Sequence, residues 1–582
     1  MKPYLKHIHK TILLIMAIML IFPSIVFGEE DIYADVKNSA ERLAEVIVND
    51  YGVSGIQYAL ISDGKIVVSG TSGIFDKDNT KSLDNQSLFG IGSTSKMFAA
   101  TAIMMLSDQG KLNLDEPVVT YIPEFKMADG RYKEITVRML LNHSSGIMGS
   151  TFVNGFLYDY PSTLNHDELL LQLAKQPLKA APGEFSVYCN DGFTLAEIVV
   201  EKVSGMSYSE FLKKNITEPL GMSNTYTPQD DFDRNRLVRT FNNGEETPVD
   251  TINLIGTGGV YSTAEDLCRL GQVYMNDPRY LPAANLLSKD AKTETMQKEY
   301  QRGFGPDQNE GLFGYGLGWD SVDAYPYSQY NIQPLIKGGD TRLYHSSFIV
   351  LPEYDMAFAV LLSGGSSIFG QVMGQYVILE ALSAENEIAE ILPPEELQTP
   401  ILCSMPLKLT SYSGLYSNDS MIMNITVGEE GKITVSSLSN KDIPDEVYLY
   451  TSEGVFVNEN GSKKLKFVEE SNGKTYIQIR QVLNLPNLGQ TVITSYEYEK
   501  TEPNKIDVLI QNAWDERSGT KYFIVNENPH GQLYHTLENT YFEITTKKEL
   551  PGYAGYHKIV NQNKAVQDVQ IPVMAGRDLS NI

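Results

Sequence analysis

The spacing of apolar residues divides the first part of the chain into helix-like and strand-like segments. Between residues 29 and 50, apolar positions recur at the interval of an α-helix, at Ala40, Leu43, Ala44, Ile47 and Val48. Residues 55–61 and 65–70 have the pattern of two strands, and the Asp63-Gly64 turn between them predicts a hairpin. Two further strand-like runs cover residues 346–351 and 356–362.

The pattern changes after residue 392 and predicts a second domain. From about residue 405 the chain has short alternating runs separated by turns such as Asn472-Gly473, which predict an antiparallel barrel or sandwich. The runs cover residues 421–427, 432–435, 476–480, 491–498, 506–510 and 521–525. We therefore expect a first domain over residues 29–395, a β-domain over 405–550 and the possible start of a further β repeat over 551–582.

The first 28 residues have the pattern of a signal peptide. A start with three lysines leads into an uninterrupted apolar run over residues 12–22, which Pro23 ends. Val26 and Gly28 then occupy the two positions that guide cleavage before Glu29. The alternative, an uncleaved membrane anchor, is disfavoured because the apolar run is short for a membrane span. We expect a secreted or extracytoplasmic protein without a stable membrane span after cleavage.

Charge and the metal-binding residue types exclude several classes of function. The 582-residue chain has a formal net charge of -26, which argues against nucleic acid or an anionic membrane surface as a partner. Three cysteines, Cys189, Cys268 and Cys403, are too few for a disulfide framework and lack metal-ligand spacing. The eight histidines contain no His-Glu-x-x-His pattern. We expect neither a metal nor another cofactor, and the sequence does not indicate an oligomeric state.

The first candidate for chemistry is the segment that begins at Phe89 and contains Ser93 and Lys96. Glycines precede Ser93, and an apolar run continues to Leu106, so the pattern predicts a loop that opens a buried helix. Lys96 then lies one turn beyond Ser93 on the same helix face. A serine hydroxyl needs a nearby base to become a nucleophile, and a desolvated lysine can supply it. The N–H groups at the helix start would stabilise a substrate oxyanion.

The Ser-x-x-Lys pattern is not specific by itself. It recurs at Ser62–Lys65, Ser471–Lys474 and Ser518–Lys521, where a glycine between strand-like runs indicates hairpin turns. Only Ser93–Lys96 opens a long apolar helix. On this motif alone, the alternative of a structural serine and lysine stays open.

A second candidate is the loop before a helix that we expect over residues 193–203. Tyr188 and Asn190 lie two residues apart on this irregular segment, so both side chains can reach one cleft. A tyrosine beside a lysine ammonium loses its proton more readily and can act as a base. An asparagine amide can orient the lysine and a substrate carbonyl. The structural alternative is a packed tyrosine and a helix-capping asparagine.

A third candidate is the strand-like segment that contains Lys337, Gly338, Gly339 and Asp340. Two glycines allow the backbone of a substrate to approach the strand closely. The backbone N–H of Asp340 would form an oxyanion hole with that of Ser93, and Lys337 would attract a substrate carboxylate. The alternative is an exposed lysine on an edge strand.

Two other polar positions favour structural roles. His143 ends a short helix expected after residue 135, beside serines and a glycine, where a hydrogen-bonding role is the simpler interpretation. Ser262 and Glu265 have the spacing of a capping box and predict the start of another helix.

Together, the three candidate segments resemble the penicillin-recognising serine hydrolases. Ser93-x-x-Lys96, Tyr188-x-Asn190 and Lys337-Gly338-Gly339 have the order and approximate spacing of that family. The resemblance is closest to the branch of class C β-lactamases, D-alanyl-D-alanine carboxypeptidases, D-aminopeptidases and related esterases. It covers residues 35–390, and Tyr412-Ser-Gly-Leu-Tyr416 resembles the opening of a lipocalin-like domain appended to some members.

The resemblance implies an α/β (α+β) fold, with an antiparallel sheet flanked by helices beside a helical subdomain and the site between them. Ser93 would attack a carbonyl to form an acyl-enzyme, and Lys96 and Tyr188 would relay protons. Asn190 would orient the substrate, while Lys337 and its glycines would line the strand edge. The implied substrate is a small molecule or peptide with an amide or ester bond, such as a D-amino-acid peptide or a β-lactam-like compound.

Two positions depart from the family pattern. Cys189 replaces the usual serine or alanine, and we expect its side chain to point away from the site. Gly338 replaces the hydroxyl residue of the Lys-Thr-Gly form, which removes a hydrogen bond to a substrate carboxylate and favours a peptidase or an esterase. Two alternatives remain: a penicillin-binding receptor that is acylated but barely turns over, and a scaffold that has lost the chemistry.

Overall fold

The computed structural model describes residues 31–275, 285–306, 310, 313–440, 442–523, 528–532, 534, 541–548, 550–566, 569 and 571–572. The predicted signal peptide, residues 1–28, lies outside this part of the chain. Within the described residues, we find no helix that combines the length and apolar character needed to cross a membrane.

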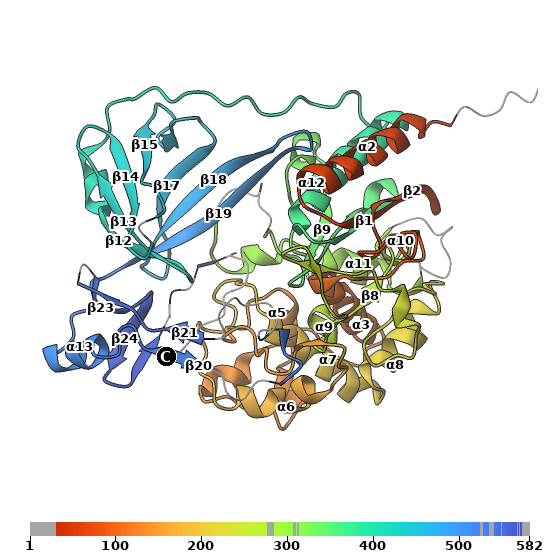
Figure 1. The fold of residues 1–582 in the computed structure, drawn as a ribbon, viewed down its shortest axis with the longest axis horizontal. Helices are drawn as coiled ribbons and strands as arrows, with labels where there is room; N and C mark the ends of the chain where they lie inside the picture. Colours follow the sequence, from red (N-terminus) through yellow and green to blue (C-terminus); the bar gives the residue numbers. More distant parts are fainter. Residues whose placement is uncertain are drawn as a thin grey trace, which may run out of the picture.

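A five-stranded antiparallel sheet with the order β2-β1-β11-β10-β9 forms the centre of the first domain (Figure 1). Its strands are β1 (Gly55–Ser62), β2 (Lys65–Gly73), β9 (Leu335–Asp340), β10 (Tyr344–Leu351) and β11 (Met356–Ser363). The four strands expected from alternation are confirmed. Asp63 and Gly64 have φ angles of 48° and 71°, which the tight β1–β2 turn requires. Strand β9, which carries Lys337, forms one edge of the sheet.

The two faces of the sheet belong to separate hydrophobic cores. Ile56 and Leu60 pack with helices α2 (Ala34–Asp50) and α12 (Ser367–Ala384). Ala59 and Ile61 point to the other face, where α3 (Lys96–Asp108), α7 (Asn190–Ser204) and α10 (Ala264–Gly271) complete the core. All residues of β1, β10 and β11 are buried, because helices cover both faces.

The helical subdomain lies between β2 and β9 in the sequence. Besides α3, α7 and α10 it contains η1 (Gly92–Ser95), α4 (Val118–Tyr121), α5 (Val137–Leu141), α6 (Leu164–Leu173), α8 (Tyr208–Leu212), α9 (Ile255–Gly258) and α11 (Lys289–Thr295). Every residue of α3 from Lys96 to Leu106 is buried, as the apolar run predicts. Helix α7 ends at Ser204, and the following Gly205 has the left-handed φ of 72° typical of a C-terminal cap.

The predicted capping box at Ser262–Glu265 is displaced by one residue. Ser262 pairs with Phe89 in a short sheet, so it is not available as the cap. Thr263 instead has an extended backbone, and its side chain accepts the N–H of Asp266 at 3.3 Å. Helix α10 therefore begins at Ala264.

A closed eight-stranded antiparallel barrel follows the first domain, as the alternating runs predict. Each strand pairs with the next along the chain, and pairing of β12 with β19 closes the barrel. The strands are β12 (Gly414–Ser417), β13 (Ile422–Val427), β14 (Lys432–Ser437), β15 (Glu446–Tyr450), β16 (Phe456–Asn458), β17 (Lys463–Glu469), β18 (Thr475–Leu485) and β19 (Gly489–Thr501). Its interior includes Tyr416, Ile433 and Ile477.

The strand expected over residues 506–510 is wrong. Residues Val508–Asp515 form helix α13, because the Asp507 side chain accepts the N–H of Leu509 at 2.7 Å and caps the helix start. Trp514 on this helix is buried in a small separate core. The local cap and a tertiary contact therefore outweigh the alternating pattern.

The segments after the barrel form two small sheets. The run over 521–525 contains β20 (Lys521–Phe523), which pairs with β21 (Tyr541–Glu543) outside the barrel. Strands β22 (Thr546–Lys547), β23 (Leu550–Ala554), β24 (His557–Asn561) and β25 (Lys564–Val566) form the other sheet. The closed barrel thus ends at Thr501, earlier than the expected range of 405–550. The division into three structural domains with these boundaries stays a prediction.

The long β18–β19 hairpin extends from the barrel to helices α2 and α12 (Figure 1). The hydroxyl of Tyr51 donates to the carbonyl oxygen of Pro486 at 2.7 Å, and Asn487 Nδ2 donates to Asp50 Oδ2 at 3.1 Å. Gly489 lies against the ring of Tyr376, since an added Cβ would come within 2.0 Å of a ring carbon. The tip of the hairpin is therefore docked on the helical layer of the first domain.

Candidate active site

Ser93 lies on η1, a single 3₁₀ turn that leads directly into the buried helix α3. The preceding Gly92 has a φ of 50°, and a Cβ at this position would lie 2.8 Å from the backbone nitrogen of Asp340. Glycine thus allows the turn to approach strand β9 closely. Ser95, the next serine, is buried, and its hydroxyl accepts the N–H of Val260 at 3.0 Å.

Lys96 is fully buried and its ammonium group joins three parts of the site. Its Nζ donates to Ser93 Oγ at 3.0 Å, to Asn190 Oδ1 at 2.8 Å and to the carbonyl oxygen of Thr257 at 2.9 Å. The first distance is within reach of direct proton transfer. The structure therefore brings together the serine, the lysine and the asparagine of two predicted motifs.

Tyr188 lies beside both lysines of the predicted site. Its ring centroid is 4.8 Å from Lys96 Nζ and 5.4 Å from Lys337 Nζ, and the side chain is buried. Such distances to an aromatic face are favourable for a cation. Cys189 follows it, with its sulfur 3.8 Å from the carbonyl oxygen of Ile147. It is absent from the lining of the Ser93 cavity, in agreement with the expected orientation.

Asn190 is the first residue of α7 and is oriented by contacts at both ends of its amide. Its Oδ1 accepts from Lys96, and its Nδ2 donates to Ser150 Oγ at 2.8 Å. Its backbone carbonyl accepts from Thr257 Oγ1 at 2.9 Å. The side chain does not cap the helix, so the structural alternative considered for Asn190 does not hold.

His143 supports the tyrosine loop, consistent with the structural role expected for it. The residue has a φ of 63°, and its ring stacks on that of Tyr188 with a centroid distance of 4.4 Å. Its Nδ1 accepts the N–H of Cys189 at 2.9 Å. Burial, followed by the charges of Lys96 and Lys337, lowers the pKa of His143 well below 6.5. The imidazole is therefore neutral at pH 7.

Lys337 lies on β9 but is not an exposed edge residue. Its side chain is fully buried, and Nζ donates to both carboxylate oxygens of Asp320, at 2.7 and 2.8 Å. A third bond of 3.0 Å goes to the carbonyl oxygen of Gly338. Burial lowers the pKa of Lys337, while the Asp320 carboxylate opposes that shift. The predicted attraction of Lys337 to a substrate carboxylate thus competes with an existing ion pair.

The two glycines of β9 have different surroundings. A Cβ on Gly339 would lie 2.1 Å from the carbonyl oxygen of Ile91 and 2.8 Å from the backbone nitrogen of Thr94. A Cβ on Gly338 would meet nothing closer than Ser367 Oγ at 3.5 Å. Gly339 is therefore required for close packing of β9 on the Ser93 turn, whereas Gly338 borders open space.

Asp340 ends β9 and lies beside the Ser93 turn, as the Gly92 contact shows. Its Oδ1 is 2.6 Å from His345 Nδ1, and its Oδ2 accepts from Ser367 Oγ at 2.6 Å. The side chain is half exposed. Its backbone nitrogen lies close to Gly92, the residue before Ser93.

One cavity of about 420 Å³ connects the predicted residues. Its lining includes Ser93, Tyr188, Asn190, Gly338, Asp340, Asp320, Phe313, Ile336, Ser366, Ser367, Ile368 and Gln371. Lys96, Lys337 and Gly339 lie behind this surface and are not among its lining residues. The three segments, which are far apart in the sequence, thus form one cleft at the edge of the sheet.

Sequence reasoning missed two residues that organise the site. Thr257 accepts from Lys96 through its carbonyl oxygen, and Asp320 pairs with Lys337. Thr257 lies in a glycine-rich stretch, and its role rests on a backbone carbonyl, which no residue type in the sequence signals. Asp320 directly follows Trp319, and its charge was the available signal.

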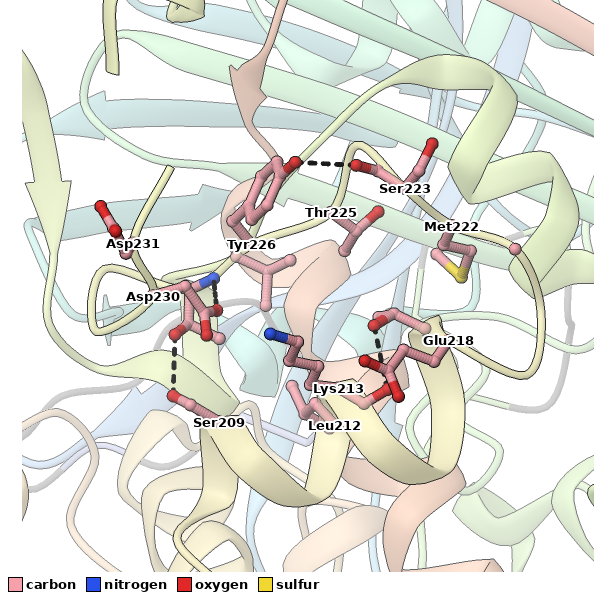
Figure 2. A pocket seen from close by; sticks show the side chains of 14 residues that line it. Ser209, Leu212, Lys213, Glu218, Met222, Ser223, Thr225, Tyr226, Asp230 and Asp231 are labelled. Carbon is pink, nitrogen blue, oxygen red and sulfur yellow. Dashed lines mark hydrogen bonds between the residues drawn. The ribbon is translucent and has the colours of Figure 1, made fainter. Parts of the chain in front are cut away.

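A second cavity, of about 510 Å³, lies at α8 and the turn that follows it (Figure 2). Ser209, Lys213, Glu218, Tyr226 and Asp230 line it, and Figure 2 shows their side chains around the opening. None of the predicted catalytic or binding residues lies there. The cavity that contains Ser93 is therefore the candidate active site.

Among the described residues, no group of three or more histidine, cysteine or acidic side chains is arranged to hold a metal ion.

An antiparallel sheet between two helical layers, with Ser93 and Lys96 at the start of a buried helix, defines the β-lactamase/transpeptidase fold. Two solved structures share this fold. SurE has a TM-score of 0.55 at 18% identity, covering 81% of this chain and all of that one. A class C β-lactamase mutant has a TM-score of 0.51 at 23% identity, covering 61% and 99%.

A Beta-lactamase family model matches residues 40–383, which is more than half of the chain. The chain therefore belongs to the β-lactamase family, and it is related to D-alanyl-D-alanine carboxypeptidases and class C β-lactamases.

Two curated relatives illustrate this relationship. AmpH of Escherichia coli (strain K12), a D-alanyl-D-alanine-carboxypeptidase/endopeptidase, is 28% identical over 284 residues, or 48% of this chain and 72% of AmpH. Penicillin-binding protein 4* of Bacillus subtilis (strain 168) is 33% identical over 167 residues, or 28% of this chain and 35% of that protein. The chain thus spans about a third of the latter relative.

Proposed function

We propose that this protein is a serine hydrolase that cleaves amide or ester bonds through an acyl-enzyme on Ser93. The observation that carries the proposal is the contact of 3.0 Å between Lys96 Nζ and Ser93 Oγ at the floor of a cavity. For the attack Lys96 acts as a neutral amine, with its two N–H groups on Asn190 and Thr257 and its lone pair toward the Ser93 hydroxyl, which gives up its proton to it as it attacks a carbonyl.

The other predicted residues have complementary roles in this proposal. Tyr188, beside the two lysines, passes a proton between Ser93, Lys96 and the leaving group. Asn190 orients Lys96 and the substrate carbonyl. The N–H groups of Ser93 and Asp340 stabilise the oxyanion, because Gly92 and Gly339 allow the turn and the strand to approach. Water then releases the acyl group.

The substrates that we propose are D-amino-acid peptides, β-lactam-like compounds or related esters. The relatives named above support this class. We also propose that the protein is exported, on the basis of the signal-peptide pattern in residues 1–28. The barrel is proposed to be lipocalin-like, supported by its eight strands paired in sequence order, and to serve as a stabilising or substrate-binding appendage.

Intact-mass measurement of the acyl-enzyme tests the nucleophile. After incubation with a penicillin or a nitrophenyl ester, the wild-type protein should gain the mass of one acyl group. Ser93→Ala should gain none, and Lys96→Ala should acylate more slowly by about 100-fold or more, since it loses the proton acceptor. Ser95→Ala is the matched control, because it removes a neighbouring hydroxyl that bonds only to the backbone of Val260 among the interactions described.

The same experiment separates the alternative functions. Acylation of Ser93→Ala at the wild-type level would contradict the assigned nucleophile. An acyl group that stays attached for hours, without release of product, would indicate a penicillin-binding protein that barely turns over. Absence of acylation in the wild-type protein with all the esters and β-lactams tried would favour a scaffold without the chemistry.

A further inference from the structure

The ammonium group of Lys337 has no donor left for a substrate. A lysine has three N–H donors. Lys337 directs two to Asp320, at 2.7 and 2.8 Å, and one to the carbonyl oxygen of Gly338, at 3.0 Å. Because the side chain is fully buried, a substrate would have to break these bonds to reach it.

The charges that face the cavity are acidic. Asp320 and Asp340 line it, whereas the buried Lys96 and Lys337 do not. Lys96 lies behind two lining residues, Ser93 and Asn190, to which it donates, and its third bond goes to the carbonyl oxygen of Thr257. A carboxylate placed beside β9 would meet the Asp320 carboxylate before it met the Lys337 ammonium.

Gly338, between Lys337 and Gly339, also offers no group that would bind an anion. Gly338 provides no hydroxyl, so this position adds no donor for an anion. Its own N–H donates to Asp320 Oδ2 at 3.0 Å and is therefore also occupied. The Lys337 ammonium and the Gly338 N–H therefore both donate to the Asp320 carboxylate.

We infer that the site selects substrates without a carboxylate beside the scissile bond, and that Asp320 is the residue that sets this preference. The inference rests on the proposed acyl-enzyme chemistry and narrows its substrate class to neutral amides and esters. Asp320 determines specificity by occupying Lys337 and by repelling an anion, while Ser93 and Lys96 perform the chemistry on either kind of substrate.

A matched pair of esters tests this inference. Both have the same N-acylated amino-acid acyl group; one leaves as phenol and the other as meta-carboxyphenol. The kcat/KM of each is divided by its rate of alkaline hydrolysis, which removes the difference in intrinsic reactivity. The wild-type protein should prefer the neutral ester by about tenfold or more, the change expected for one unfavourable charge contact.

Two variants test whether Asp320 sets the preference for the neutral ester. Asp320→Asn removes the charge and weakens the hold on Lys337, so the ratio should move toward the carboxylate ester by about tenfold. Asp340→Asn is the matched control: it removes the same charge from the same cavity, but among the interactions described Asp340 acts on Lys337 only through its charge and forms no hydrogen bond with it. It should change the ratio much less than Asp320→Asn does.

Each result has a defined meaning. Equal use of the two esters by the wild-type protein would overturn the inference while leaving Ser93 acylation intact. Equal shifts in the two variants would overturn the role of Asp320, because overall charge would then explain the preference. If Asp320→Asn does not fold, the ratio of the two normalised kcat/KM values of the wild-type protein still decides whether the site prefers the neutral ester. Failure of both esters to acylate Ser93 would instead overturn the proposed function.

Discussion

At the scale of single residues, the chemistry depends on how closely the Ser93 turn meets strand β9. Ser93, Lys96, Tyr188 and Asn190 were identifiable from sequence because their spacing places each at the start of a helix or in the loop before one. Asp320 was not, because its ion pair depends on tertiary contact with a lysine 17 positions away. A local pattern does not encode that approach.

The two glycines of β9 should respond differently to an added methyl group. Gly339→Ala would place a Cβ 2.1 Å from the carbonyl oxygen of Ile91, so the Ser93 turn must move. We expect a loss of about 2 kcal/mol in the free energy of unfolding and a fall in kcat/KM of about 100-fold or more, as overpacking displaces the nucleophile. Thermal unfolding and ester hydrolysis measure the two effects.

Gly338→Ala is the control for this substitution. Its Cβ would have only ordinary contacts, the nearest at 3.5 Å, so its stability should stay within about 1 kcal/mol of the wild-type protein. Similar losses in the two variants would show that the close approach of β9 and η1 does not explain the need for glycine.

At the scale of elements, alternation and helical spacing predicted the central sheet and α2, because both are amphipathic or fully apolar. The same reasoning failed at residues 506–510, where Asp507 caps a helix. It also placed the cap of α10 one residue early, because pairing of Ser262 with Phe89 removes that residue from the helix. Local hydrogen bonds therefore decide the ends and types of short elements.

Helices α6 and α7 are joined by an ion pair that should make stability depend on pH. His166 on α6 lies 3.0 Å from Glu201 on α7. Burial alone would lower the pKa of His166, but Glu201, Glu197 and Asp167 outweigh it and raise the pKa to about 9. The ion pair of protonated His166 stabilises the protein fully below pH 6.5, and this stabilisation is lost as the pH rises from 6.5 to about 9.

Comparison with His166→Gln tests this dependence. The difference in the free energy of unfolding between the wild-type protein and the variant should be largest near pH 6. It should decrease by up to about 3 kcal/mol as the pH approaches 9. Urea unfolding at pH 6, 7.5 and 9 measures this difference, which cancels the titration of groups that do not interact with His166; Glu197, whose pKa is raised to about 7 by burial although the charge of His166 lowers it, contributes to the difference. A difference that grows with pH would contradict the raised pKa.

At the scale of the whole molecule, Arg480 joins the barrel to two carboxylates that precede it in the chain. Arg480 on β18 donates to Glu310 at 2.5 Å and to Glu395 at 2.6 and 2.9 Å. Glu310 precedes Phe313, which lines the cavity. The sequence predicted a β-domain after residue 405 but not this contact, since nothing in the alternating pattern distinguishes Arg480 from other exposed charges.

Removal of the Arg480 side-chain charge should loosen this connection. Arg480→Met leaves two carboxylates without their shared cation, so we expect a loss of about 2 kcal/mol or more and a higher KM with little change in kcat. Differential scanning calorimetry and ester kinetics measure these changes. Lys464→Met on β17, which breaks an ion pair with Glu453 within the barrel, should affect neither. Unchanged KM in Arg480→Met would show that the barrel does not influence the cavity.

The docking of the β18–β19 hairpin has a consequence for how the chain acquires its structure during synthesis. Tyr51, at the end of the first described helix, bonds to Pro486, a residue made 435 positions later. Strand β1 likewise waits for β11, its central partner in the sheet. A ribosome therefore releases the beginning of the hydrolase domain long before its surroundings exist. The sheet can close once β11 has been made, but docking of the hairpin must await the last third of the chain, and a premature stop within the barrel would leave the helix surface that the hairpin covers exposed to aggregation.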